Sequence, residues 1–172
     1  MNSLHRPYRA VTRLMASAPD AKPWFLHGLD SPDFTQLEEK DGYVVRKYSP
    51  SKWVGITFSE HSWSDATSAG FRYLFRYISG TNQTSQKVPM TSPVLTKIER
   101  SQNAEGNSNH TVLFAVPRQF IENTPLPTES GVKVVEIPEM TACVIEFGGF
   151  PSNRSFAKHV GRLADLLHRD KM

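Results

Sequence analysis

The chain has 172 residues, of which 38% are apolar and 22% charged, so it is long enough to bury one sizeable core and short for two. No apolar run approaches the roughly 20 residues of a membrane-spanning helix, and the start lacks the apolar stretch of a secretory signal. The formal charge of +3 is concentrated in residues 1–23, which carry four basic and one acidic side chain, so the other 149 residues carry sixteen of each. We therefore predict one soluble domain that does not bind nucleic acid.

The first 33 residues mix Arg, Ser, Ala and Pro without sustained periodicity. They are predicted to be a flexible leader to one folded domain over residues 34–172. The start has no acidic residue before Asp20, a composition shared by mitochondrial presequences and disordered cytosolic leaders. The expected location is the cytoplasm, with the mitochondrion, through residues 1–20, as the alternative. Cys143 is the only cysteine, which excludes an internal disulfide and fits a reducing compartment.

Residues 43–48 and 53–58 read as two strands, and the turn between them contains Pro50, so a hairpin is predicted. A 3.6-residue apolar period then predicts a helix over residues 63–79. Its N-cap signal is Ser62 or Ser64, and Gly80 offers a C-terminal stop. Strands at 94–99 and 111–116, separated by the polar loop 100–110, make a second predicted hairpin.

After a Pro-containing loop over residues 119–130, residues 132–137 and 141–147 are again predicted strands. A final helix is expected to start at Ser152 or Asn153 and to end near Arg169. A shift of 89 positions superimposes the two halves, for example Val45 on Val134 and Leu74 on Leu163. The repeated unit is β-β-α-β-β, and the second copy lacks its last two strands. We expect a truncated or splice form, with a complete protein of one and a half copies as the alternative.

Motifs of catalysis are not found in the sequence. It has no Gly-x-Ser-x-Gly elbow, no His-Glu-x-x-His, no phosphate-binding loop and no dinucleotide fingerprint. The Ser, His and Asp residues between His61 and Asp65 are explained by helix capping. The sequence therefore predicts a protein that is not an enzyme.

Four segments carry a family resemblance: Tyr43–Trp53, Lys87–Val94 with its Met-Thr-Ser-Pro-Val run, Val116–Phe120 and Phe147–Phe150. In order and spacing they resemble the SOUL family of heme-binding proteins, over roughly residues 34–169. The resemblance implies an α+β fold, a distorted antiparallel β-barrel of two β-β-α-β-β repeats with a long helix packed on each side. It also implies reversible, non-catalytic binding of heme or another porphyrin, in heme buffering or transport.

The first helix has two apolar faces when each residue advances it by about 100°. Trp63, Gly70 and Leu74 belong to a broad face that suits packing on a sheet, whereas Ser68, Phe71 and Phe75 fall on nearly the opposite side, bordered by Arg72 and Arg76. A porphyrin macrocycle gains from aromatic contact and its propionates from guanidinium groups. The alternative is that Phe71 and Phe75 pack under the loop after Gly80 or against Trp24 and Phe25.

The family's tetrapyrrole contacts are thought to lie on this helix, which implies roles for Ser68, Phe71 and Arg76, although a serine supplies no charge. The axial histidine of one well-known member would stand at Lys47, so that ligand is absent. His61 is the candidate to replace it, while His159 and His168 are expected at the surface. No Cys-Pro dipeptide offers a thiolate to iron. Binding without a protein ligand to iron is therefore predicted.

A second function is suggested by the final helix. Val160, Leu163, Ala164, Asp165 and Leu167 loosely resemble the Leu and Ala/Gly-Asp pattern of BH3 segments in cell-death regulation, a role to which some SOUL proteins are linked. That role would make residues 156–168 a surface for a protein partner. The same spacing also describes the apolar stripe of any helix that packs on a core.

Overall fold

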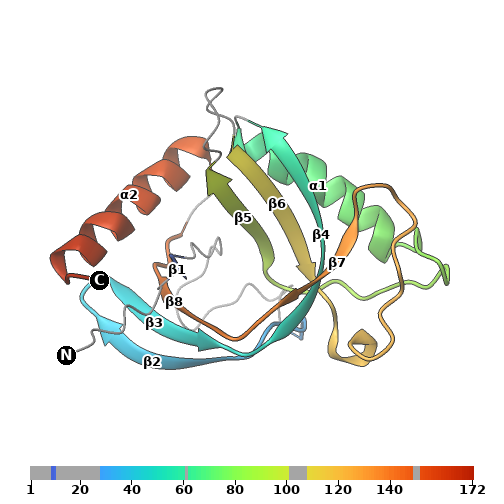
Figure 1. Ribbon diagram of the computed structural model, residues 1–172, viewed down its shortest axis with the longest axis horizontal. Helices are drawn as coiled ribbons and strands as arrows, with labels where there is room; N and C mark the ends of the chain where they lie inside the picture. Colours follow the sequence, from blue (N-terminus) through green and yellow to red (C-terminus); the bar gives the residue numbers. More distant parts are fainter. Residues whose placement is uncertain (1–8, 11–27, 61, 101–107, 149–151) are drawn as a thin grey trace, which may run out of the picture.

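The computed structural model describes residues 9–10, 28–60, 62–100, 108–148 and 152–172 (Figure 1). In chain order its elements are β1 (Arg9–Ala10), β2 (Phe34–Lys40), β3 (Tyr43–Tyr48), β4 (Ser51–Glu60), α1 (Trp63–Ile78), β5 (Val94–Arg100), β6 (Ser108–Ala115), the 3-10 helix η2 (Arg118–Phe120), β7 (Lys133–Ile137), β8 (Met140–Val144) and α2 (Asn153–Arg169). Antiparallel sheets combined with helices confirm the predicted α+β class.

The strands form two four-stranded sheets, ordered β1-β8-β3-β2 and β5-β6-β4-β7. All neighbours run antiparallel except β1 and β8, which are parallel. The helices lie on opposite sides of the molecule: α1 packs on the outer face of the second sheet and α2 on that of the first (Figure 1). The pairings of the described strands do not join the two sheets, so the predicted closed barrel is not confirmed.

The hairpin predicted between residues 43–48 and 53–58 is wrong, although both strands are present. β3 pairs with β2 and β8, whereas β4 pairs with β6 and β7. A strand has only two hydrogen-bonding edges, and those of β3 are both occupied, so the turn at Ser49 and Pro50 carries the chain from one sheet into the other. The second predicted hairpin is confirmed, because β5 pairs with β6 and places Val94 opposite Phe114.

Strand β2 was not predicted as a separate element. Phe34 and Leu37 are its only apolar residues, and every residue from Phe34 to Glu39 is exposed. A strand at a sheet edge that buries neither face lacks the alternation by which a half-buried strand is recognised. Its backbone pairing with β3, from Phe34 opposite Tyr48 to Lys40 opposite Tyr43, is what places it in the sheet.

Both predicted helices are confirmed, and the structure selects one of the two N-caps proposed for each. The Oγ of Ser62 accepts a hydrogen bond from the backbone N–H of Asp65, and the Ser152 Oγ accepts one from the Ser155 N–H within a capping box. Asn153 links the two helix starts, because its Oδ1 accepts from the Ser64 N–H at 3.2 Å. Among the described residues, no helix is long and apolar enough to cross a membrane.

The offset of 89 positions that relates the two halves of the sequence also relates two strand pairings. Val45 of β3 lies opposite Cys143 of β8. Val134, 89 positions after Val45, lies opposite Val54 of β4, which is 89 positions before Cys143. The neighbouring pairs on each ladder follow the same rule, so the contact of β3 with β8 is matched in register by that of β7 with β4.

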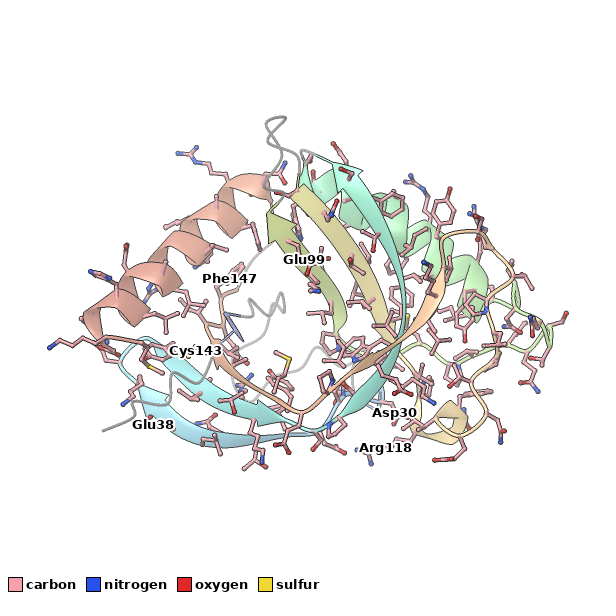
Figure 2. All side chains as sticks on the ribbon, in the orientation of Figure 1. Asp30, Glu38, Glu99, Arg118, Cys143 and Phe147 are labelled. Carbon is pink, nitrogen blue, oxygen red and sulfur yellow. The ribbon has the colours of Figure 1, made fainter. Side chains whose placement is uncertain are left out.

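Two apolar cores hold the helices to the sheets. Beneath α1, Leu74 packs with Val54 and Val112, and each of these side chains is at most 1% exposed. Beneath α2, Leu163 packs with Val45 and Cys143, the latter visible between the helix and the sheet in Figure 2. Fully burying a Leu or Val side chain contributes about 1.5–3 kcal/mol, so these contacts fix which face of each helix remains at the surface.

Tyr43 should make the fold sensitive to alkali. Its hydroxyl donates to the Asp170 carboxylate at 2.9 Å, and burial together with this hydrogen bond raises its pKa to about 12. Below pH 10 the tyrosine is neutral in both states; above pH 10 the unfolded chain ionises first, so stability falls as pH rises towards 12. Tyr43→Phe should cost about 1 kcal/mol at pH 8 through the lost hydrogen bond. In urea unfolding, the free energies of unfolding of Tyr43→Phe and of the unsubstituted protein should differ less at pH 10–11 than at pH 8. A difference independent of pH would contradict this role of Tyr43.

Candidate functional site

The outer face of α1 carries an exposed aromatic strip, Phe71 and Phe75, as the 3.6-residue period predicts. The opposite face is in the core, with Trp63, Ala66, Gly70, Leu74 and Tyr77 all buried. Ser68 lies one turn before Phe71 and is exposed as well. The helix therefore presents Ser68, Phe71 and Phe75 on one side while its other side anchors it to the β5-β6-β4-β7 sheet.

The two rings of the strip are stacked on each other. Phe71 is 39% exposed and Phe75 51%, and their ring centroids lie 6.0 Å apart at an interplanar angle of 14°. Phe71 also contacts the buried Phe114 of β6 edge-on at 5.3 Å, whereas Phe75 has no further ring contact among the described residues. Phe71 thus joins the strip to the core. The described part of the loop after Gly80 leaves both rings exposed; Trp24 and Phe25 lie outside the described residues.

Arg72 and Arg76 border the strip but differ in their partners. Arg76 donates from Nε and Nη2 to the two carboxylate oxygens of Glu129, with an Nε–Oε2 distance of 3.2 Å. Its guanidinium also lies 4.6 Å from the ring centroid of Tyr73. The hydrogen bond to Glu129 raises the pKa of Arg76. Arg72 is exposed and has no hydrogen bond or ion pair with the described part of the chain.

The histidines in the described ranges belong either to α2 or to β6, and none is on α1. His159 and His168 are on α2, where the ring of His159 stacks on Phe147 at 3.8 Å (Phe147 is labelled in Figure 2). Burial, with Lys158 and Arg162 nearby, lowers the pKa of His159. His110 of β6 is 3% exposed, and neither ring nitrogen has a hydrogen-bond partner within the described part of the chain. His61, the predicted candidate for iron, lies outside the described residues.

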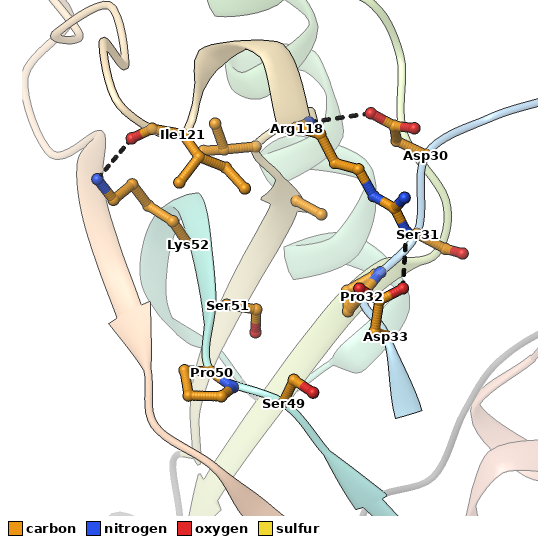
Figure 3. A pocket seen from close by; sticks show the side chains of 12 residues that line it. Asp30, Ser31, Pro32, Asp33, Ser49, Pro50, Ser51, Lys52, Arg118 and Ile121 are labelled. Atoms are coloured by element: carbon orange, nitrogen blue, oxygen red, sulfur yellow. Dashed lines mark hydrogen bonds and ion pairs between the residues drawn. The ribbon is translucent and has the colours of Figure 1, made fainter. Parts of the chain in front are cut away.

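Two cavities formed by described residues are separate from the strip. One, of about 70 Å³, lies between residues 30–33 and 49–52, where Arg118 binds Asp30 through its backbone N–H and Asp33 through its guanidinium (Figure 3). The other, of about 210 Å³, is lined by the buried Arg46 and its partner Glu146. Sites for drug-sized ligands usually measure about 300–1,000 Å³, so neither cavity suits a porphyrin. The strip is an open surface.

The apolar stripe of α2 faces the protein rather than solvent. Leu163 is 2% exposed in the core beneath α2, and Leu166 and Leu167 are half-buried against the same cluster. Ala164 and Asp165 are exposed. A partner that bound the apolar stripe of this helix, as BH3 segments are bound, would therefore have to detach α2 from the sheet first. The BH3-like role stays a prediction.

Glu129, the ion-pair partner of Arg76, is a charged residue beside the strip that sequence reasoning did not find. It lies in the loop before β7, 53 positions from Arg76, and its side chain is 23% exposed. Loop residues have no periodicity that reveals a partner on a helix. The buried Val132 and the hydrogen bond from Tyr77 Oη to the Pro125 carbonyl at 2.8 Å hold this loop against α1.

Comparison of the sequence with known proteins identifies the family of the chain. The chain is 33% identical over 128 residues to heme-binding protein 2 of Homo sapiens, covering 74% of the chain and 62% of that protein. It is 30% identical over 146 residues to heme-binding protein 2 of Mus musculus (83% and 71%) and 28% identical over 134 residues to heme-binding protein 1 of Xenopus laevis (77% and 70%). The model of the SOUL heme-binding protein family matches residues 29–172, and the chain belongs to that family.

Proposed function

We propose that the protein binds heme and related porphyrins reversibly, without catalysis, on the outer face of α1. The observation that carries the proposal is the stacked, half-exposed pair of Phe71 and Phe75 beside Arg72, which has no partner in the described structure. An apolar pair of this kind at the surface is free to contact a ligand. The names of the relatives and of the family supply the class of ligand.

Each residue of the proposed site, the strip together with Arg72 and Ser68, has a physical role in this proposal. The rings of Phe71 and Phe75 contact the flat macrocycle and remove apolar area from water. Arg72 donates to a propionate, for which a guanidinium forms charge-assisted, bidentate hydrogen bonds. Ser68, at the end of the strip, adds one hydroxyl and no charge. An open site of this kind suits buffering or transport, because the ligand leaves without any part of the fold opening.

The proposal includes binding without a protein ligand to iron. His159 and His168 belong to the other helix, and His110 is enclosed in the core face of β6.

We also propose an architecture of two related halves, in which α2 occupies the place that α1 occupies in the first half. The matched registers of the two ladders favour it. The second helix does not repeat the strip, since Phe71 and Phe75 correspond to Val160 and Ala164.

Titration with hemin and with iron-free protoporphyrin tests the proposed function. We expect the two dissociation constants to agree within about tenfold, which corresponds to 1.4 kcal/mol, because the contacts proposed involve the macrocycle and the propionates. The visible spectrum of bound hemin should show no nitrogen ligand to iron. If hemin bound a hundredfold more tightly and its spectrum indicated a histidine ligand, iron coordination would carry the binding. Absence of saturable binding for both ligands would refute the function itself.

A further inference from the structure

Arg72 and Arg76 lie one helical turn apart beside the same aromatic strip, but of the two only Arg76 has an ion-pair partner among the described residues. Both oxygens of the Glu129 carboxylate accept hydrogen bonds from its guanidinium. This two-point arrangement is the one in which a guanidinium binds a ligand carboxylate. Glu129 therefore occupies the face of Arg76 that a propionate would use.

The position of Glu129 is set by the fold of its loop. The Glu129 carbonyl accepts a hydrogen bond from the Val132 N–H at 3.2 Å, and Val132 is buried in the core beneath α1. On the other side of the loop, Asn82 and Pro127 form an isolated bridge that ties it to the end of the helix region. The carboxylate is thus presented to Arg76 by an anchored loop.

We propose, on the basis of the porphyrin-binding function above, that Glu129 is a specificity-determining residue that competes with ligand carboxylates for Arg76. A ligand with one carboxylate at Arg72 binds without disturbing the Arg76–Glu129 pair. A second carboxylate must displace Glu129 or remain in solvent. The pair therefore lowers the advantage of dicarboxylate porphyrins over porphyrins whose carboxylates are esterified.

Glu129→Gln tests the competition directly. Exposed ion pairs are weak, so removing the competing charge should tighten binding of iron-free protoporphyrin by about threefold. Binding of its dimethyl ester should not change, because the ester offers no carboxylate to Arg76. The gain should vanish when Glu129→Gln is combined with Arg76→Gln and should persist when it is combined with Arg72→Gln.

Two controls separate this competition from general electrostatics. Glu122→Gln makes the same change of charge at an exposed residue of the same loop region that has no partner in the described structure. It should leave both dissociation constants unchanged at moderate salt, since distant surface charges are screened. Glu129→Ala serves as a second variant, and thermal melts confirm that each variant is folded.

The outcomes are distinguishable from failure of the binding function. If Phe75→Ala weakens binding but Glu129→Gln leaves the ratio of dicarboxylate to ester affinity unchanged, the competition is refuted and the site stands. An equal gain for the ester, an equal gain in Glu122→Gln, or weaker dicarboxylate binding in Glu129→Gln refutes it too. If Phe75→Ala also leaves binding unchanged, the strip is not the site and both proposals fall.

Discussion

Replacing Phe75 with alanine is expected to weaken porphyrin binding by about tenfold and to leave stability nearly unchanged. The ring is 51% exposed and contacts, among the described aromatic residues, only Phe71. An aromatic contact is worth about 0.5–1.5 kcal/mol beyond the area it buries, and 1.4 kcal/mol is a factor of ten in affinity. Substitutions at exposed positions usually change the free energy of unfolding by no more than about 0.5 kcal/mol. Absorption titrations and urea unfolding of one preparation measure both quantities.

Leu126→Ala is the matched control for Phe75→Ala. Leu126 is 52% exposed, so the two substitutions remove similarly accessible apolar side chains, but Leu126 lies in the loop before β7 and not on the strip. The Leu126→Ala variant should bind porphyrin with the same dissociation constant as the unsubstituted protein. Equal losses in both variants would indicate non-specific adsorption to apolar surface. A lower melting temperature with intact binding in Phe75→Ala would place Phe75 in the core instead.

Phe71→Ala should differ from Phe75→Ala in a way that the sequence did not predict. Phe71 shares the strip with Phe75, but it also packs edge-on against the buried Phe114. Its removal is therefore expected to reduce both affinity and stability. From the sequence the two phenylalanines are equivalent, because they are one turn apart on one face, and only the position of β6 under the helix separates their roles.

The parts of the fold that depend on local sequence could be predicted. The period of α1 identified the face that packs on the sheet, although not the buried Ile78, and serine signals located the start of each helix to within one or two residues. The sheet partners of β3 and β4 could not be predicted. β8 on one edge of β3 and both neighbours of β4, β6 and β7, lie far along the chain, and β2 on the other edge of β3 has no strand pattern in the sequence. A turn at Pro50 is compatible with both a hairpin and a passage between sheets.

In the candidate site, too, the features that depend on local sequence could be predicted, and those that depend on distant residues could not. Phe71, Phe75 and their arginine neighbours share one helix, so helical geometry alone placed them together. The state of Arg76 depends on Glu129, which approaches from a loop 53 positions away. The sequence therefore predicted the arginine but not that its guanidinium is already bound, and the difference between Arg72 and Arg76 became visible only in the structure.

Gly70→Ala is expected to lower the stability of the protein by about 1–2 kcal/mol, because overpacking a core costs about 1–3 kcal/mol and the gain in helix propensity offsets part of it. Gly70 lies on the buried face of α1, and a Cβ there would stand 2.5 Å from Cγ2 and 2.6 Å from Cβ of Val112 on β6. The helix must move away from the sheet to admit one methyl group. For a chain of this size, a loss of 1 kcal/mol corresponds to roughly 2–4 °C in melting temperature.

Gly161→Ala is expected to change stability in the opposite direction from Gly70→Ala, although both glycines lie inside helices. Gly161 is in the middle of α2 and exposed, and apart from the adjacent helix backbone no described atom would lie within 4 Å of an alanine Cβ there. Alanine should stabilise that helix by about 0.5–1 kcal/mol, since glycine loses more conformational freedom on folding. Both variants make the same chemical change at helix interiors, so helix propensity alone predicts two stabilised proteins. If Gly70→Ala were as stable as Gly161→Ala, the close contact of α1 with β6 would not exist. The strip on the far side of α1 would then lack the rigid support on which its proposed binding depends.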